Sequence, residues 1–239
     1  MTVAAESDVL ARGHLPTAPS ELARFERRLP VMLSTLAGLV DVIGYLNLGI
    51  FTAHVTGNLV VIAAVPVRRG PLNISQVLAV PVFAAAVGVV WLIARALGKR
   101  GSALARPLLS IQFLLLSCVF TLSVVLNPAT NQHSLSAIVV AMIAVAAMAC
   151  QFALLRLAVP GAPSTAVMTG NLTNAVLALM DSLSSRPLAN GSEERLKKSA
   201  KDVVGFCAGC IAGAATVSLL GAWAWSIPVA LAGVAVILR

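Results

Sequence analysis

The stretch HVTGNL at residues 54–59 recurs as VMTGNL at residues 167–172. Each copy follows a long apolar run and an irregular segment that contains glycine or proline, and each leads into a short apolar segment. A three-residue Thr-Gly-Asn match alone has little weight, but the same order of elements on both sides favours duplication over chance. The sequence therefore predicts two related halves, at about residues 30–126 and 134–239.

The composition around these motifs indicates a membrane protein. Apolar residues make up 59% of the 239 residues and charged residues only 11%, and the mean hydropathy is +0.93. This leaves too little polar surface to coat a soluble globule. Runs of about 20 apolar residues can cross a hydrocarbon core of ~30 Å as helices. The predicted fold is an all-α, polytopic membrane helical bundle with six candidate spans at residues 30–50, 72–94, 107–126, 134–155, 203–223 and 227–238.

Two further apolar segments, residues 56–67 and 169–183, cover roughly half a bilayer at about 1.5 Å per residue. Re-entrant half-helices would leave six spans, whereas complete crossings would give eight. The six-span threading, with the N-terminus inside, puts every Lys and Arg except Arg68 and Arg69 on one side. The eight-span threading moves Arg156 and the basic cluster of residues 95–106 outside. Because cytoplasmic loops collect Lys and Arg, we favour six spans with both termini cytoplasmic.

In the six-span threading three spans separate the two motifs, so the halves have opposite orientations, as in many transporters. Residues 1–29 are predicted to form a partly disordered cytoplasmic tail without a signal peptide, and residues 30–239 a single transmembrane domain. Residues 192–201 are predicted to form a solvated cytoplasmic connection. The net charge of +8 comes from Lys and Arg residues in the short segments that flank the apolar runs, where they set the membrane topology. No nucleic-acid partner is therefore expected.

Four segments resemble a known family: AGLVDVIGY (37–45), HVTGN (54–58), QFALLR (151–156) and VMTGNLTN (167–174). Together they are similar to the signatures of the YoaK-like family of uncharacterised bacterial integral membrane proteins, which carry a domain of unknown function. The resemblance extends over nearly the whole chain from about Pro30. It implies a multi-pass protein of the bacterial plasma (inner) membrane and implies no activity.

Asp41 is the only acidic residue near the middle of a predicted span. A charged carboxylate there costs about 2.5–3.5 kcal/mol on insertion scales, so it must be neutral, paired or facing water. Ser34, Gly38 and Tyr45 share its helix face, which we expect to point into the bundle. Asp41 is thus a candidate proton or cation site. The alternative is a structural carboxylate, bonded to backbone amides or paired with a basic residue such as Arg156.

The Thr-Gly-Asn motifs predict a second feature of the site. Thr56 and Thr169 are candidate N-caps, and Asn58 and Asn171 fall in the first helical turn. Two helix N-termini near the bilayer midplane could bind an anion or a polar ligand. Alternatively, these residues only satisfy the broken backbone and pack the halves together. With Gln151 in the position of Asp41, the candidate substrate or ion ligands are Asp41, Tyr45, Thr56, Gly57, Asn58, Gln151, Arg156, Thr169, Gly170, Asn171 and Asn174.

Enzymatic activity is not expected. The histidines form no H-x-x-x-H pair, a lone Asp41 cannot form an aspartyl dyad, and neither a nucleophile elbow nor a phosphate loop occurs. No metal or cofactor is expected either. Gly205, Gly209 and Gly213 form a ridge that allows close helix approach, within the chain or in a homodimer.

Two functions remain open. The first is a small-solute secondary transporter or channel with a midplane site, favoured by analogy with inverted-repeat architectures. The second is a non-transporting membrane protein that binds a lipid or a partner protein.

Overall fold

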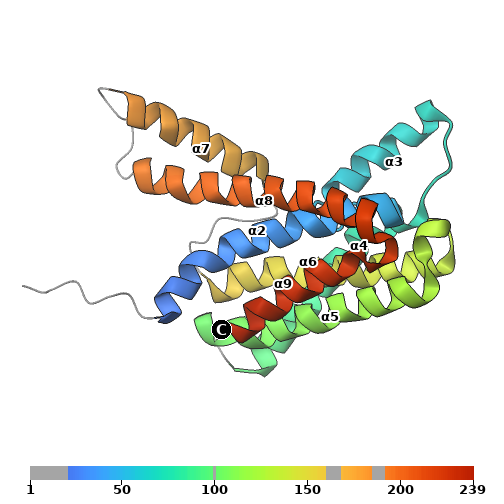
Figure 1. Ribbon diagram of the computed structural model, residues 1–239, viewed down its shortest axis with the longest axis horizontal. Helices are drawn as coiled ribbons and strands as arrows, with labels where there is room; N and C mark the ends of the chain where they lie inside the picture. Colours follow the sequence, from blue (N-terminus) through green and yellow to red (C-terminus); the bar gives the residue numbers. More distant parts are fainter. Residues whose placement is uncertain (1–20, 99–100, 160–167, 185–191) are drawn as a thin grey trace, which may run out of the picture.

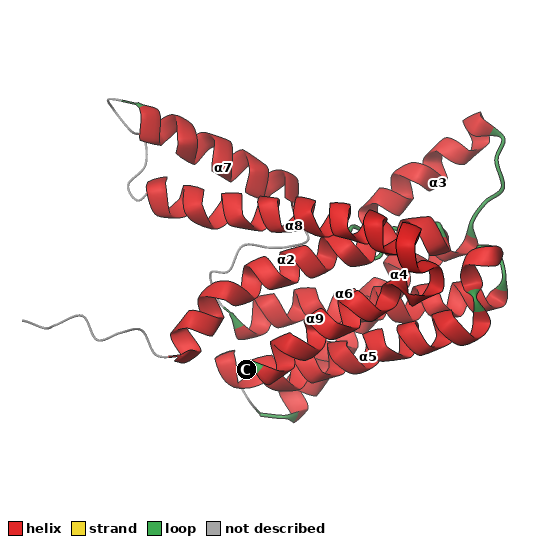
Figure 2. Ribbon diagram, in the orientation of Figure 1, coloured by secondary structure: helices red, strands yellow, loops and turns green. Residues whose placement is uncertain are grey.

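The computed structural model describes residues 21–98, 101–159, 168–184 and 192–239, and these residues form helices and short connections without a strand (Figures 1 and 2). The predicted all-α class is therefore confirmed. The elements are α2 (Glu21–Leu48), α3 (Thr56–Arg68), α4 (Ile74–Ala96), η1 (Gly101–Leu104), α5 (Ala105–Leu126), η2 (Pro128–Thr130), α6 (Leu135–Ala158), α7 (Met168–Leu183), α8 (Ser192–Leu220), η3 (Gly221–Trp225) and α9 (Ser226–Ile237).

Two helices extend beyond the apolar runs that predicted them. α2 begins at Glu21, so residues 21–29 are helical and do not belong to a disordered tail. α8 begins at Ser192, so the predicted solvated connection of residues 192–201 is the first part of this helix. Glu, Arg and Lys have high helix propensity, which lets a helix continue past the end of its apolar run.

The helices run back and forth along one bundle. Five apolar helical runs are long enough to cross a membrane, and the fifth, Glu193–Ile237, has 45 residues. This run turns at η3, after which α9 returns along α5 (Figure 1). Trp223 contacts Phe120, and Arg239 donates to the Ser102 carbonyl at 2.6 Å. Several apolar helices of spanning length indicate a multi-pass membrane architecture.

The half-helix α3 follows a fold-back of the chain. The chain folds back after α2, so that residues 52–54 bond to Asp41 in the interior of α2. From this level α3 runs to the end of the bundle where α4 begins. There Asn73 and Gln76 bond to the carbonyls of Leu48 and Gly49. α3 therefore leaves on the side from which its segment entered, as a re-entrant helix does.

The second half-helix, α7, lies against the first part of α8 and ends near the start of that helix (Figure 1). α3 and α7 thus point toward opposite ends of the bundle. Opposite directions of α3 and α7 are what an inverted repeat predicts, whereas the six-span threading stays a prediction.

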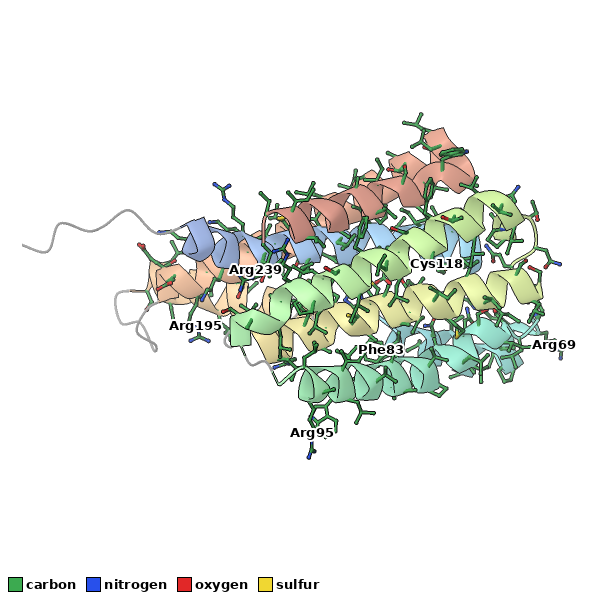
Figure 3. The ribbon with its side chains drawn as sticks, turned by 90° about the horizontal axis from the view of Figure 1, so that it is seen from below. Arg69, Phe83, Arg95, Cys118, Arg195 and Arg239 are labelled. Atoms are coloured by element: carbon green, nitrogen blue, oxygen red, sulfur yellow. The ribbon has the colours of Figure 1, made fainter. Side chains whose placement is uncertain are left out.

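Basic residues gather at one end of the bundle, which we call the basic end. Arg95, Arg195 and Arg239 lie toward this end and Arg69 lies at the other (Figure 3). The described positions thus agree with the predicted separation of Arg68 and Arg69 from the other basic residues.

The glycine ridge holds α8 parallel to α2. A Cβ atom at Gly209 would lie 2.1 Å from the Thr35 carbonyl oxygen, and one at Gly213 would lie 3.0 Å from that of Leu39. On the facing helix, a Cβ atom at Gly38 would lie 2.2 Å from the Phe206 carbonyl oxygen. The ridge is therefore used for packing within the chain, and α2 covers the face that a homodimer through Gly205, Gly209 and Gly213 would need.

Candidate functional site

Asp41 anchors the segment that folds back from α2. The residue lies seven positions before the end of α2 and is 5% exposed. Its Oδ1 atom accepts the backbone N–H groups of Thr52 at 2.8 Å, Ala53 at 2.7 Å and His54 at 3.3 Å. No water reaches the middle of a bilayer to solvate such amides, so an internal acceptor is required. The carboxylate supplies that acceptor where the backbone cannot.

The second oxygen of Asp41 pairs with a histidine. Its Oδ2 atom lies 2.5 Å from His54 Nδ1, and the His54 side chain is 26% exposed. Nδ1 of His54 thus points at the carboxylate, and Nε2 is the other ring nitrogen. His54 Nε2 is buried without a hydrogen-bond partner, and the ring packs edge-on against Phe206 with centroids 5.0 Å apart. A buried carboxylate thus meets a half-buried imidazole at this point of the bundle.

Asn58 completes the fold of the re-entrant segment. Its side chain is fully buried. Its Oδ1 accepts the Phe51 N–H at 2.9 Å, and its Nδ2 donates to the Phe51 carbonyl at 2.8 Å. One amide side chain therefore replaces both backbone partners of a residue outside regular structure. Of the two predicted roles of this asparagine, satisfying the broken backbone is the one that the structure shows.

The predicted anion site at the start of α3 is not formed. The N–H groups of Gly57 and Asn58 donate to the carbonyls of His54 at 2.8 Å and Val55 at 3.2 Å, so they are already used. Thr56 is the first residue of α3 and is exposed, while Val55 occupies the N-cap position without a side-chain bond. The N-cap role of Thr56 was wrong because the turn that begins at His54 supplies the first carbonyl acceptors.

Two other candidates lie away from the pair. Ser34 and Asp41 are buried as expected, but Tyr45 is 49% exposed and stacks on Phe51 with centroids 5.0 Å apart. Arg156 is exposed in the last turn of α6. His54 takes the place next to Asp41 that the sequence suggested for Arg156.

The second half has a polar residue at the position that corresponds to Asp41, but this residue is uncharged. Gln151 lies seven positions before the end of α6, as Asp41 does in α2. Its Nε2 donates to the Leu33 carbonyl at 2.9 Å, and its Oε1 accepts from Gln112 Nε2 at 2.7 Å. Both glutamines are fully buried. A neutral amide pair thus stands in the core where the first half has Asp41.

In α7, Asn171 is buried whereas Thr169 and Asn174 are exposed and Gly170 is half-buried. Thr169 is the second residue of this helix and not its N-cap. The irregular segment before α7, residues 160–167, lies outside the described residues. α3 packs on α4 and α7 packs on α8. The predicted shared site of the two Thr-Gly-Asn segments stays a prediction.

Sequence reasoning missed His54 as a site residue, although a signal was present. In the aligned motifs Val167 stands opposite His54, just as Gln151 stands opposite Asp41. The acid and the histidine are both present in the first half and both replaced in the second. Paired replacement of this kind indicates that the two side chains work together.

The chain belongs to the family described as protein of unknown function (DUF1275), whose model matches residues 29–238. The expected membership of an uncharacterised family is thereby confirmed. No curated protein and no solved structure matches the chain.

Proposed function

We propose that the protein is a secondary transporter or channel for small polar solutes, driven by or permeable to protons. The observation that carries this proposal is the Asp41–His54 pair, in which a buried carboxylate inside a membrane bundle bonds to a half-buried histidine and holds a re-entrant segment. Ionisable residues at membrane depth are costly, and a proton pathway is one of the functions that retains them. Of the proton and cation sites expected from Asp41, we propose a proton site, because the acid is paired with an imidazole.

Proton binding at the pair can act on the re-entrant segment directly. Oδ1 of Asp41 accepts the amides of the segment and Oδ2 faces the His54 imidazole, so a proton bound at the pair lies between these two side chains. Gain or loss of that proton changes the net charge beside the amides of Thr52 and Ala53. The segment that carries these amides also carries α3. A proton can therefore shift the balance between two positions of this half-helix.

In the second half a neutral amide takes the position of Asp41. Gln151 bonds there to Gln112 of the first half, and α7 adds the exposed polar side chains of Thr169 and Asn174. Half-helices from opposite ends of an inverted repeat occur in transporters that work by alternating access. We assign the basic end to the cytoplasm and the protein to the bacterial plasma membrane, following the distribution of Lys and Arg.

The alternative function is binding of a lipid or a partner protein without transport. It is favoured by the complete use of Asp41 and Asn58 in hydrogen bonds within the chain. The large exposed apolar side chains of α3 and α7, such as Val60 and Leu177, also offer contact area to lipid. In this case Asp41 would be a structural anchor.

Purified protein in phosphatidylethanolamine and phosphatidylglycerol liposomes would separate the two functions. We expect proton flux into vesicles under an imposed pH gradient, altered by at least one member of a broad panel of small solutes. His54→Gln should remain folded, because glutamine can still donate to Asp41, and should lose the flux. Glu194→Gln, an exposed acid at the basic end, is the control and should behave as wild type. Wild-type vesicles with neither flux nor solute binding would refute transport.

A further inference from the structure

Asp202 is a second acidic side chain buried in the bundle. The sequence placed it at the edge of a solvated connection, but α8 begins ten residues earlier and packs there on α2 and α7. Asp202 is 1% exposed, and its Oδ2 atom has no hydrogen-bond partner. A buried carboxylate without a partner is costly, and such a group holds a proton more readily than an exposed one. The fold alone gives no reason for an acid at this position.

The helix face that carries Asp202 leads to the Asp41–His54 pair. Asp202 and Phe206 are four residues apart, so they lie on one face of α8, about 6 Å apart along its axis. The Phe206 ring touches the His54 ring, and its backbone lies against Gly38 of α2. Asp202 lies on the side of Phe206 nearer to the basic end. The two buried atoms without partners, Asp202 Oδ2 and His54 Nε2, thus belong to residues that flank the same phenylalanine.

The charged groups around Asp202 do not form an ion pair with it in the described residues. Lys198 lies one turn earlier on α8, and its positive charge favours the ionised carboxylate. Lys201 and Arg28, which are nearby on α8 and at the start of α2, are exposed. Asp181 is the only charged residue of α7. Opposing effects of burial and of Lys198 suit a carboxyl group that binds and releases a proton.

We infer that Asp202 is a second proton-binding site, which exchanges protons between the basic end of the bundle and His54 Nε2. In the inward step His54 Nε2 takes the proton from the carboxylic acid of Asp202. The products are a carboxylate at Asp202 and an imidazolium at His54, whose charge is balanced by Asp41. The reverse step returns the proton. This inference rests on the proposed proton-coupled function.

Infrared difference spectra of the purified protein, recorded as the pH is changed, test the site without any solute. We expect the C=O band of a buried carboxylic acid to disappear in Asp202→Asn and to persist in Glu194→Gln. The pH at which this band appears should shift in His54→Gln, because the two groups share a proton. Asp202→Glu, which keeps a carboxyl group, should move the band without removing it. This variant tests the site if Asp202→Asn fails to fold.

The liposome assay distinguishes this inference from the proposed function. Asp202→Asn should slow proton flux about tenfold or more, as expected when a positioned proton carrier is removed, with an unchanged melting temperature. If the wild-type protein shows no proton flux, transport is refuted. The infrared result then decides by itself whether Asp202 binds a proton. The inference is overturned if no band depends on Asp202, or if its titration is the same in His54→Gln and in the wild type.

Discussion

Removing the carboxylate of Asp41 should release the re-entrant segment. In Asp41→Ala, the N–H groups of Thr52 and Ala53, both in buried residues, lose their only recorded acceptor. Each buried amide left without an acceptor costs about 1–3 kcal/mol, so the variant should lose about 2–6 kcal/mol. The less buried amide of His54, at 3.3 Å, should add little.

The isosteric variant gives the size of the charge effect. Asp41→Asn keeps an oxygen for these amides but replaces charge-assisted bonds with neutral ones. The difference is about 1 kcal/mol per bond, so the two short bonds predict a loss of about 2 kcal/mol. Asp41→Asn should therefore be less stable than the wild type and more stable than Asp41→Ala.

Hydrogen exchange of the purified protein in micelles measures the stability of the re-entrant segment at single amides. The amides of Thr52 and Ala53 should exchange slowly in the wild type, faster in Asp41→Asn and fastest in Asp41→Ala. Amides of the central helix α6 should be unaffected, and Glu194→Ala serves as a control for loss of an exposed carboxylate. Equal protection of Thr52 and Ala53 in the wild type and in Asp41→Ala would refute the role of Asp41 as the anchor.

Three further predictions concern the fold around the site. Gly209→Ala, whose Cβ would meet the Thr35 carbonyl at 2.1 Å, should lower stability by about 1–3 kcal/mol through overpacking; Gly88→Ala, with no atom within 4 Å of its Cβ, should be neutral or gain up to about 1 kcal/mol. Thermal unfolding in detergent compares the two, and equal melting temperatures would contradict the close α2–α8 contact. Asn58→Leu should lower stability by about 1–3 kcal/mol because both bonds to Phe51 disappear, whereas Asn174→Leu on the exposed face of α7 should leave stability unchanged. The melting temperature checks this, and an unchanged value for Asn58→Leu would refute the role of Asn58 in holding Phe51. In a cysteine-free background, cysteines at Arg68 and Asn131 should be labelled from one side of the membrane and one at Lys197 from the other; labelling of Arg68 and Lys197 from the same side would exclude the six-pass arrangement.

The membrane class and the positions of the helices follow from local properties of the chain. Apolar runs, their lengths and the Lys and Arg residues between them predicted α4, α5 and α6 to within three residues at each end. The two short apolar segments of the sequence likewise predicted α3 and α7 as separate short helices. These properties depend on the solvent that a segment prefers, so the amino-acid sequence is sufficient to read them.

The partners of the polar side chains depend on how the backbone folds back. Gly49, with a φ of +71°, lies in the turn that returns the chain toward Asp41 after α2. This turn brings His54 to the carboxylate and leaves Arg156 far along α6. No spacing rule for a single helix predicts such a contact, because the two residues belong to different elements.

Helix pairing likewise required the tertiary structure. The glycine ridge indicated a close helix contact, but only the packing shows that α2 is the partner and that the two helices are parallel. That pairing places Phe206 against His54 and buries Asp202 beside them. The sequence thus determines that this is a membrane protein with two half-helices, because burial in lipid is a property of each segment. Which acid meets which histidine is decided by the packing of α2, α8 and the re-entrant segment, because hydrogen bonds and ion pairs require the two groups to be brought within contact distance.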